Sequence, residues 1–170
     1  VVLLPPAYDA SREALTRSMR MRPHVLYIDR PHNPTGQVVP LEDLDEICRL
    51  CEKQGTWVIV DEAYADYIPR EEWSSSLPNP NLIVVRSFSK AMGLAGVRVG
   101  YAVIRDRELR DIYRKTHPPF TVSTPGEVLA LAALEDRAFL ERTREYAGRA
   151  KGALLQALEG HPLITAAKTD

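Results

Sequence analysis

The sequence predicts an α/β protein with a mainly parallel β-sheet in a three-layer α/β/α arrangement. Two observations carry this prediction. Short, continuous apolar runs, which are typical of buried strands, alternate along the chain with segments of helical periodicity. The strand–helix–strand order that results favours right-handed parallel crossovers, which place helices against the faces of a sheet.

The length and composition are those of a globular domain. The chain has 170 residues, of which 45% are hydrophobic and 26% are charged, so it can bury one sizeable core. A formal net charge of −1 gives no reason to expect nucleic acid or an anionic membrane as a partner. No apolar run is long enough to cross a bilayer and no signal peptide is visible, so we expect a cytoplasmic protein. Because the chain opens on V-V-L-L, which resembles the middle of a strand, we also expect it to be a fragment.

Strands and helices alternate in the first half of the chain. Trp57–Val60 is a continuous apolar run, as expected of a strand that is covered on both faces. The expected strands are Val1–Leu4, Val25–Ile28 and Trp57–Val60, and the expected helices are Ser11–Met21 and Pro40–Gln54. A loop with the sequence R-P-H-N-P-T-G-Q-V-V occupies Arg30–Val39.

The second half begins with a polar segment, Asp66–Pro80, which we expect to lie on the surface. Asp106, and either Ser123 or Thr124, are suited to cap the helices that follow them. The expected strands are Leu82–Val85, Val97–Ile104 and Leu163–Ala166, and the expected helices are Asp106–His117, Ser123–Leu134 and Arg137–Leu158.

Both cysteines lie in one C-x-x-C segment, Cys48 and Cys51, which invites a redox or metal interpretation. The apolar residues around them have helical spacing, so both thiols fall inside a helix and away from its N-terminus, where thiolates are stabilised. No second Cys or His pair completes a zinc set, and we expect no metal site. The sequence therefore favours two core cysteines in a reducing compartment.

Polar residues follow three of the expected strands in turn. Asn33 follows the strand at 25–28, and Asp61 and Tyr64 follow the strand at 57–60. The strand at 82–85 is followed by Ser87, Ser89, Lys90 and Arg98. Since ligands of parallel α/β sheets bind beyond the carboxyl ends of the strands, we expect these residues at one edge of the sheet. Taken singly, N-P-T-G could be an ordinary turn, Asp61 a cap, and Lys90 and Arg98 solvated side chains.

The third set has the chemistry of a phosphate site beside a nucleophilic amine. Small hydroxyls and glycines let backbone N–H groups approach a phosphate, and the Arg98 guanidinium can pair with it bidentately. A lysine such as Lys90 can lose its proton in such a place and attack a carbonyl carbon. This combination suggests pyridoxal phosphate, whose aldehyde needs an amine.

Three motifs resemble those of one enzyme family. The segments are H-N-P-T-G at 32–36, D-E-A-Y at 61–64 and S-F-S-K-A-M-G-L-A-G-V-R-V-G-Y at 87–101. Together they resemble the large-domain core of fold-type I, pyridoxal-phosphate-dependent aminotransferases of classes I and II, whose large domain has the aspartate-aminotransferase-like fold. The last motif is similar to that of the histidinol-phosphate aminotransferase branch, which also contains threonine-phosphate decarboxylases.

The resemblance implies a role for each site residue. Lys90 would form the internal aldimine and move a proton, and Asp61 would pair with the pyridine nitrogen. Asn33 and Tyr64 would bind the phenolic oxygen of the ring, with Tyr64 counted among the catalytic residues. The phosphate would be held by Ser87, Ser89 and Arg98.

The resemblance also implies what surrounds this core. Residues 1–140 would be an incomplete cofactor-binding large domain, and residues 141–170 a linking helix and the start of a small C-terminal domain. The full-length protein would be a homodimer that acts on an amino acid or a phosphorylated amine and on a 2-oxo acid. The glycine-rich phosphate turn and the arginine for the substrate carboxylate would lie outside the chain, so the fragment alone is expected to be inactive. The aromatic residue that stacks on the ring is left unassigned.

Two alternatives stay open at this point. The cofactor motifs do not separate a transaminase from a pyridoxal-phosphate decarboxylase or lyase, because the substrate-binding residues decide which bond breaks. A non-catalytic module with an aminotransferase-like scaffold is the other alternative, although such a module would normally follow a basic DNA-binding segment, and none is visible.

Overall fold

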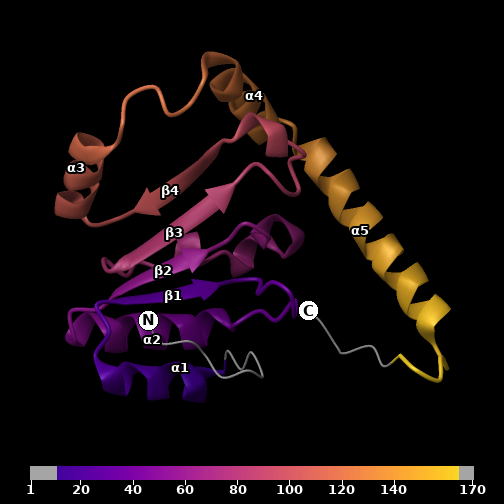
Figure 1. Cartoon of the computed structure of the whole chain (residues 1–170), viewed down its shortest axis with the longest axis horizontal. Coiled ribbons are helices and arrows are strands. Elements are labelled where there is room, and N and C mark those ends of the chain that lie inside the picture. The colour runs from indigo at the N-terminus through magenta and orange to yellow at the C-terminus, as the bar shows by residue number, and fades with distance from the viewer. Residues whose placement is uncertain (1–10, 165–170) are drawn as a thin grey trace.

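A four-stranded mixed sheet forms the centre of the protein (Figure 1). The computed structural model describes residues 11–164. Strands β1 (Val25–Asp29), β2 (Trp57–Asp61), β3 (Leu82–Ser87) and β4 (Gly100–Ile104) lie in the order β1-β2-β3-β4. The β1–β2 and β2–β3 pairs are parallel, and β4 is antiparallel to β3. The mainly parallel α/β architecture predicted from the sequence is confirmed.

Two helices cover one face of the sheet. Helix α1 (Arg12–Ser18), continued by a 3₁₀ turn at Met19–Met21, packs against α2 (Leu41–Lys53), and both contribute to the main core. Alternate strand residues face them: Leu26, Ile28, Val58, Val60, Leu82 and Val84 are all buried. The intervening residues point to the opposite face, where Val25 and Tyr27 are exposed. The residues at the carboxyl ends of the strands therefore divide between a buried and an open side.

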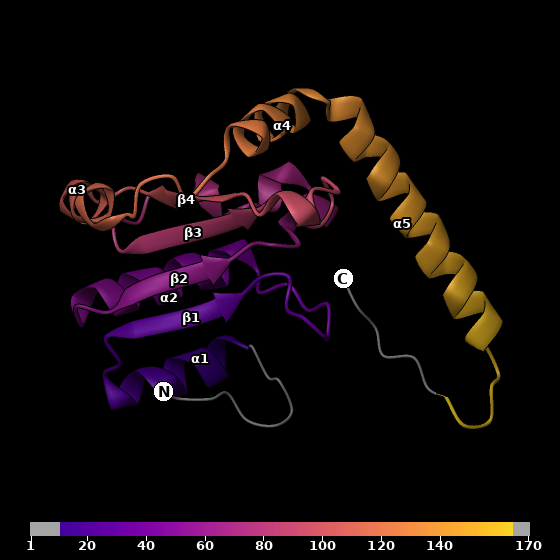
Figure 2. The same ribbon diagram turned by 45° about the horizontal axis from the view of Figure 1, so that its top comes forward.

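Three further helices follow the sheet. They are α3 (Arg107–Thr116), α4 (Thr124–Glu135) and α5 (Arg137–Leu158). Asp106, Ser123 and Asp136 cap them, each by accepting a backbone N–H bond on its side-chain oxygen. In both ribbon views α5 extends as a single rod on the side towards which the arrowheads of β1–β3 point (Figure 2). The carboxyl ends of the parallel strands thus lie on the side of α5.

The prediction that both cysteines lie in the core is confirmed. Cys48 and Cys51 are both fully buried on α2 within the main core. Burial raises the pKa of Cys48 to about 12 and that of Cys51 to about 11. Within residues 11–164, no group of three or more His, Cys, Asp and Glu side chains could hold a metal ion. In the same range, no helix is long and apolar enough to cross a membrane.

Three sequence-based expectations about elements are corrected. The strand expected from Val97 begins only at Gly100, because residues 95–97 form a 3₁₀ turn and Arg98 has a left-handed φ of 59°. In the strand expected at Leu163–Ala166, Leu163 lies in a turn. The part of this expected strand beyond Ile164 and the whole strand expected at Val1–Leu4 lie outside the described residues.

The segment expected on the surface, Asp66–Pro80, is the third correction. It forms short 3₁₀ turns, and several of its residues are buried, among them Asp66, Ser74 and Leu77. The cause is long-range pairing: Asp66 binds Arg86 of β3, and the Ser74 N–H donates to Glu62. Composition alone cannot reveal partners that lie so far along the chain.

Candidate active site

The register of the sheet brings the ends of three strands together. Asp61, the last residue of β2, pairs with Asp29 of β1, and β3 ends beside them at Ser87. Two backbone bonds continue the ladders past the strand ends: the Arg30 N–H donates to the Asp61 carbonyl, and the Glu62 N–H donates to the Val85 carbonyl, both at 2.8 Å. The polar sets predicted from the sequence therefore follow neighbouring strands at one sheet edge.

Asp61 has both carboxylate oxygens engaged. Its Oδ1 accepts the Ala63 N–H at 2.9 Å, and its Oδ2 accepts the Tyr27 hydroxyl at 2.6 Å. The carboxylate is partly exposed on the open face of the sheet, with its orientation set from two sides. The pKa of Tyr27 is raised, mainly by burial and further by the hydrogen bond to Asp61 and the charge of Asp61.

Tyr27 is a site residue that the sequence analysis missed. Strand alternation was the available signal, since Tyr27 lies two residues before Asp29 and therefore on the same face as Asp61.

The N-P-T-G loop is a closed turn that presents Asn33. The Gly36 N–H donates to the His32 carbonyl at 2.7 Å, and Gly36 has a φ of 74°, which a glycine adopts without strain. The Asn33 N–H donates to Asp29 Oδ2 at 3.0 Å, so the turn is tied to the end of β1. From there Asn33 Nδ2 donates to the Tyr64 hydroxyl at 3.2 Å. This loop and Tyr64 line a cavity of about 280 Å³.

Lys90 lies on the tight turn that follows β3. The Ser89 N–H donates to Ser87 Oγ at 3.1 Å, and the Gly93 N–H donates to the Lys90 carbonyl at 2.9 Å. The buried Phe88 anchors this turn in a small second core. Lys90 itself is exposed, and its Nζ lies 5.1 Å from the centroid of the Tyr64 ring. The turn therefore carries the amine towards the Asn33–Tyr64 pair.

Arg98, like Asp61, makes its hydrogen bonds within residues 11–164 to groups other than the predicted site residues. Its guanidinium donates from Nη1 to the Ala95 carbonyl at 3.0 Å and is exposed. Among the described residues, no hydrogen bond connects Arg98 with Ser87, Ser89 or Lys90. It nevertheless lies at the far end of the same loop, between Lys90 and β4.

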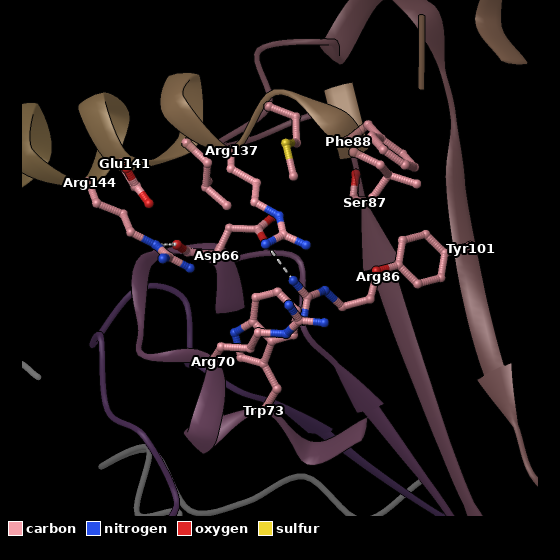
Figure 3. Close-up of a pocket in the computed structure, with 13 residues that line it drawn as sticks. Asp66, Arg70, Trp73, Arg86, Ser87, Phe88, Tyr101, Arg137, Glu141 and Arg144 are labelled. Carbon is pink, nitrogen blue, oxygen red and sulfur yellow. Dashed lines mark hydrogen bonds and ion pairs between the residues drawn. The ribbon is translucent and has the colours of Figure 1, made fainter. Parts of the chain in front are cut away.

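A second cavity, of about 360 Å³, lies beside the site (Figure 3). Of the residues predicted from the sequence, Ser87 alone lines it. Helix α5 contributes Arg137 and Arg144 to its wall, and Asp66 and Arg86 lie across from them. The Arg144 side chain donates from Nε to the Asp66 carbonyl, which ties α5 to the segment after β2.

Beneath the strand ends lies a set of buried charges that the sequence analysis also missed. Arg30, Glu62, Asp66 and Arg86 are all at most 4% exposed. Burial lowers the pKa of Arg30, whereas the charges of Glu62 and Glu72 oppose this shift. Two of these residues could have been recognised from the sequence, because the charged residues Glu62 and Arg86 directly adjoin Asp61 and Ser87.

Comparison with known proteins assigns this arrangement to a family. Residues 6–166 match the family described as aminotransferase class I and II. The chain is 38% identical over 153 residues to histidinol-phosphate aminotransferase 1 of Cupriavidus pinatubonensis, covering 88% of this chain and 39% of the relative. The chain spans about 40% of the length of the curated relatives that it matches.

Solved structures agree. The histidinol-phosphate aminotransferase of Sinorhizobium meliloti, solved with pyridoxal 5′-phosphate, is 30% identical and superposes with a TM-score of 0.69 over 77% of this chain and 36% of that one. The histidinol-phosphate aminotransferase of Clostridium acetobutylicum is 19% identical, with a TM-score of 0.82 over 91% of this chain and 47% of that one. The second match concerns the fold alone, and it confirms the large-domain fold expected from the motifs.

Proposed function

Because the chain belongs to the class I and II aminotransferase family, we propose that it is the cofactor-holding part of a pyridoxal-phosphate-dependent aminotransferase. The observation that carries the proposal is that Asn33 and Lys90 both contact Tyr64, in the segment that begins with Asp61. Each of these side chains comes after a different strand or turn, and sheet register brings them to one edge. Enzymes of α/β type bind their ligands at this edge.

The chemistry of the side chains fits pyridoxal phosphate. The cofactor supplies, when bound, an electron-accepting ring. Asp61 is a carboxylate with a set orientation, suited to a ring N–H. Lys90 is an exposed amine that can bond to an aldehyde carbon, and Asn33 and Tyr64 offer an amide and a hydroxyl next to it. Hydroxyls and a guanidinium, from Ser87, Ser89 and Arg98, suit a phosphate dianion.

Lys90 is the residue that we expect to move the proton. An amine can do so only while it is neutral. The Lys90 Nζ lies 5.1 Å from the centroid of the Tyr64 ring. Asp61 would pair with the ring nitrogen. The catalytic residues of the proposal are accordingly Lys90, Asp61 and Tyr64.

The names of the relatives suggest the substrate class. Several curated relatives are histidinol-phosphate aminotransferases. We therefore propose a phosphorylated amino alcohol as the amino donor and a 2-oxo acid as the acceptor, in a cytoplasmic homodimer. In this scheme residues 1–140 are the large domain, and α5 leads into a second domain from residue 141. Exposed apolar residues along α5, such as Tyr146 and Leu154, support a further packing partner for that helix.

A covalent trapping experiment tests the cofactor assignment. The 170-residue chain is mixed with substoichiometric pyridoxal phosphate and reduced with borohydride, and peptide mass spectrometry then locates the adduct. We expect the adduct on Lys90, with the exposed Lys53 and Lys115 labelled far less, and its loss in Lys90→Ala. The substitution Asp61→Asn should lower the yield at Lys90 without changing that at Lys115. Equal labelling of all three lysines would contradict the proposal.

A second assay tests the reaction type. The intact protein is supplied with histidinol phosphate or another amino donor, with and without 2-oxoglutarate. Product that depends on the 2-oxo acid is expected of a transaminase. Release of carbon dioxide or of an unsaturated product without the 2-oxo acid would instead identify a decarboxylase or lyase on the same scaffold.

A further inference from the structure

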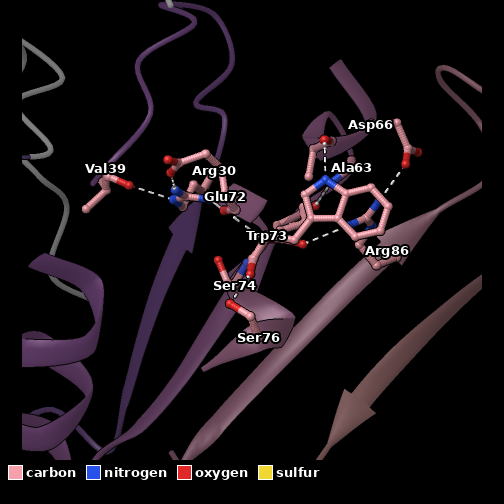
Figure 4. Close-up of polar contacts among 12 residues, drawn as sticks. Arg30, Val39, Ala63, Asp66, Glu72, Trp73, Ser74, Ser76 and Arg86 are labelled. Carbon is pink, nitrogen blue, oxygen red and sulfur yellow. Dashed lines mark hydrogen bonds and ion pairs between the residues drawn. The ribbon is translucent and has the colours of Figure 1, made fainter. Parts of the chain in front are cut away.

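Four buried charged side chains form a connected network directly beneath the candidate site. Arg86 Nη1 lies 2.9 Å from Glu62 Oε2, and Arg86 Nη2 lies 2.6 Å from Asp66 Oδ1. Arg30 Nη1 lies 3.9 Å from Glu62 Oε1, and Arg30 continues to the Val39 carbonyl and to Glu72 (Figure 4). The four side chains carry two positive and two negative charges, so the interior remains balanced.

The network joins the same two strand ends that carry the site. Asp61 directly precedes Glu62, and Arg86 directly precedes Ser87. Successive side chains of an extended chain point to opposite faces, and burial follows this rule. Glu62 and Arg86 are buried, whereas Asp61 and Ser87 are partly exposed on the open side. The Glu62–Arg86 ion pair on the buried side therefore connects the chain next to Asp61 with the chain next to Ser87.

The ion pair lies where the backbone ladder between these strands runs out. The last paired residues of β2 and β3 are Asp61 and Val85, and one further backbone bond runs from the Glu62 N–H to the Val85 carbonyl. Past this point the chain after β2 turns away into the 3₁₀ segment at Ala65–Tyr67. The contact between Glu62 and Arg86 is the first side-chain link beyond the ladder.

We infer that Glu62 and Arg86 are positioning residues, whose ion pair holds Asp61 and Ser87 at the separation that the cofactor requires. The inference rests on the proposed function. Asp61 would face the ring nitrogen and Ser87 the phosphate, which are two separate groups of the cofactor. A shift of one strand end relative to the other would therefore move one contact out of place, and misplacements of about 1 Å are costly in such sites.

Arg86 is suited to this task by its shape. Its planar guanidinium binds Glu62 and Asp66 at the same time, which one ammonium group cannot do with the same geometry. The plane is itself held by Trp73, because Cζ of Arg86 lies 4.0 Å from the centre of the Trp73 ring, and Trp73 Nε1 donates to the Ala65 carbonyl. Arg86 thus connects β3 with both the start and the continuation of the D-E-A-Y segment.

The substitution Arg86→Lys separates positioning from charge balance, because it keeps the buried positive charge and removes the fork. The 170-residue chain and its variants are measured for pyridoxal phosphate affinity by absorbance, for borohydride-trapped adduct on Lys90 by mass spectrometry, and for unfolding in urea. We expect the affinity of the folded Arg86→Lys variant to fall by about tenfold or more.

Two control variants make the comparison specific. Arg12→Lys makes the same chemical change in a surface ion pair that is remote from the site, in which Arg12 Nη1 lies 2.8 Å from Glu46 Oε2. Ile47→Val destabilises the core, in which Ile47 is 1% exposed, without touching the network. Both should leave the cofactor affinity of the folded protein within about twofold, as expected for distant, uncoupled sites.

If Arg86→Lys does not fold, Glu62→Gln decides the question. The amide keeps an acceptor for the Ser74 N–H, which donates to Glu62 Oε1 at 2.6 Å, and it removes the charge that attracts Arg86. Affinity for pyridoxal phosphate lowered in the folded variant, well beyond the Ile47→Val control, supports the inference. A network variant that loses stability but binds the cofactor as well as Ile47→Val overturns it and leaves the proposed function intact. Failure of the unmodified chain to form an adduct on Lys90 overturns the proposed function, and the inference falls with it.

Discussion

Asn33 Nδ2 donates a hydrogen bond to the Tyr64 hydroxyl at 3.2 Å across 31 positions of sequence, and Lys90 Nζ lies 5.1 Å from the centre of the same Tyr64 ring. Tyr64 therefore contacts one site residue through its hydroxyl and another through its ring face. This double contact makes it the central residue of the candidate site.

We predict that Asn33 and Tyr64 act on the cofactor as a coupled pair. Asn33→Ala and Tyr64→Phe each remove one partner of the same hydrogen bond, so the double variant should lose less affinity for pyridoxal phosphate than the sum of the two losses. A coupling of about 0.5–1 kcal/mol is expected for residues in direct contact. The measurement is a double-mutant cycle on binding, and strictly additive losses would contradict a joint action.

We predict that Tyr27→Phe lowers the yield of the Lys90 adduct. The variant removes the 2.6 Å hydrogen bond to Asp61 Oδ2 and leaves only the Ala63 N–H to orient the carboxylate. A loss of about three- to tenfold in cofactor affinity corresponds to one hydrogen bond of typical strength. Tyr113→Phe on α3 is the matched control, since it makes the same change in another exposed tyrosine. Equal effects of the two variants would argue against a role for Tyr27.

We predict that Gly100→Ala destabilises the fold, whereas Gly96→Ala does not. A Cβ atom at Gly100 would lie 2.6 Å from the Arg86 carbonyl oxygen, so β4 would have to move away from β3. A Cβ atom at Gly96 would meet nothing within 4 Å. Urea unfolding should show a cost of about 1–3 kcal/mol at position 100, which is typical of overpacking. Comparable free energies of unfolding for both variants would contradict this account of β4.

We predict that the two buried cysteines make stability fall at alkaline pH. The pKa of Cys48 is raised from 9.0 to about 12 by burial, and that of Cys51 to about 11. The unfolded chain then releases thiol protons at lower pH than the folded chain. The thiol contribution is therefore complete below about pH 9 and is lost as the pH rises towards 12.

The double variant Cys48→Ala/Cys51→Ala isolates this effect from lysine and tyrosine titration. Its free energy of unfolding should fall less steeply between pH 9 and pH 11 than that of the unmodified chain. In addition, a thiol reagent should label the folded unmodified chain slowly at pH 8, because both thiols are buried and protonated. Rapid labelling without unfolding, or parallel pH profiles for the two proteins, would show that the thiols are accessible.

The sequence by itself determined the local elements and the chemically distinctive residues. Apolar runs predicted β1, β2 and β3 to within one or two residues, because a buried strand is a continuous local signal. Asp61 was recognisable because it directly follows such a run, and Lys90 because it follows another run within the motif S-F-S-K. The assignment of roles to these residues remains a prediction.

The tertiary structure alone decided which distant residues meet. Arg86 finds Glu62 across 24 positions, Tyr27 finds Asp61 across 34, and Arg144 finds the Asp66 carbonyl across 78. The antiparallel direction of β4 and the burial of the segment after Tyr64 depend on the same long-range contacts. Periodicity reports which face of an element is apolar, but the partner of a buried charge is set by strand order and register, which no local window of sequence contains.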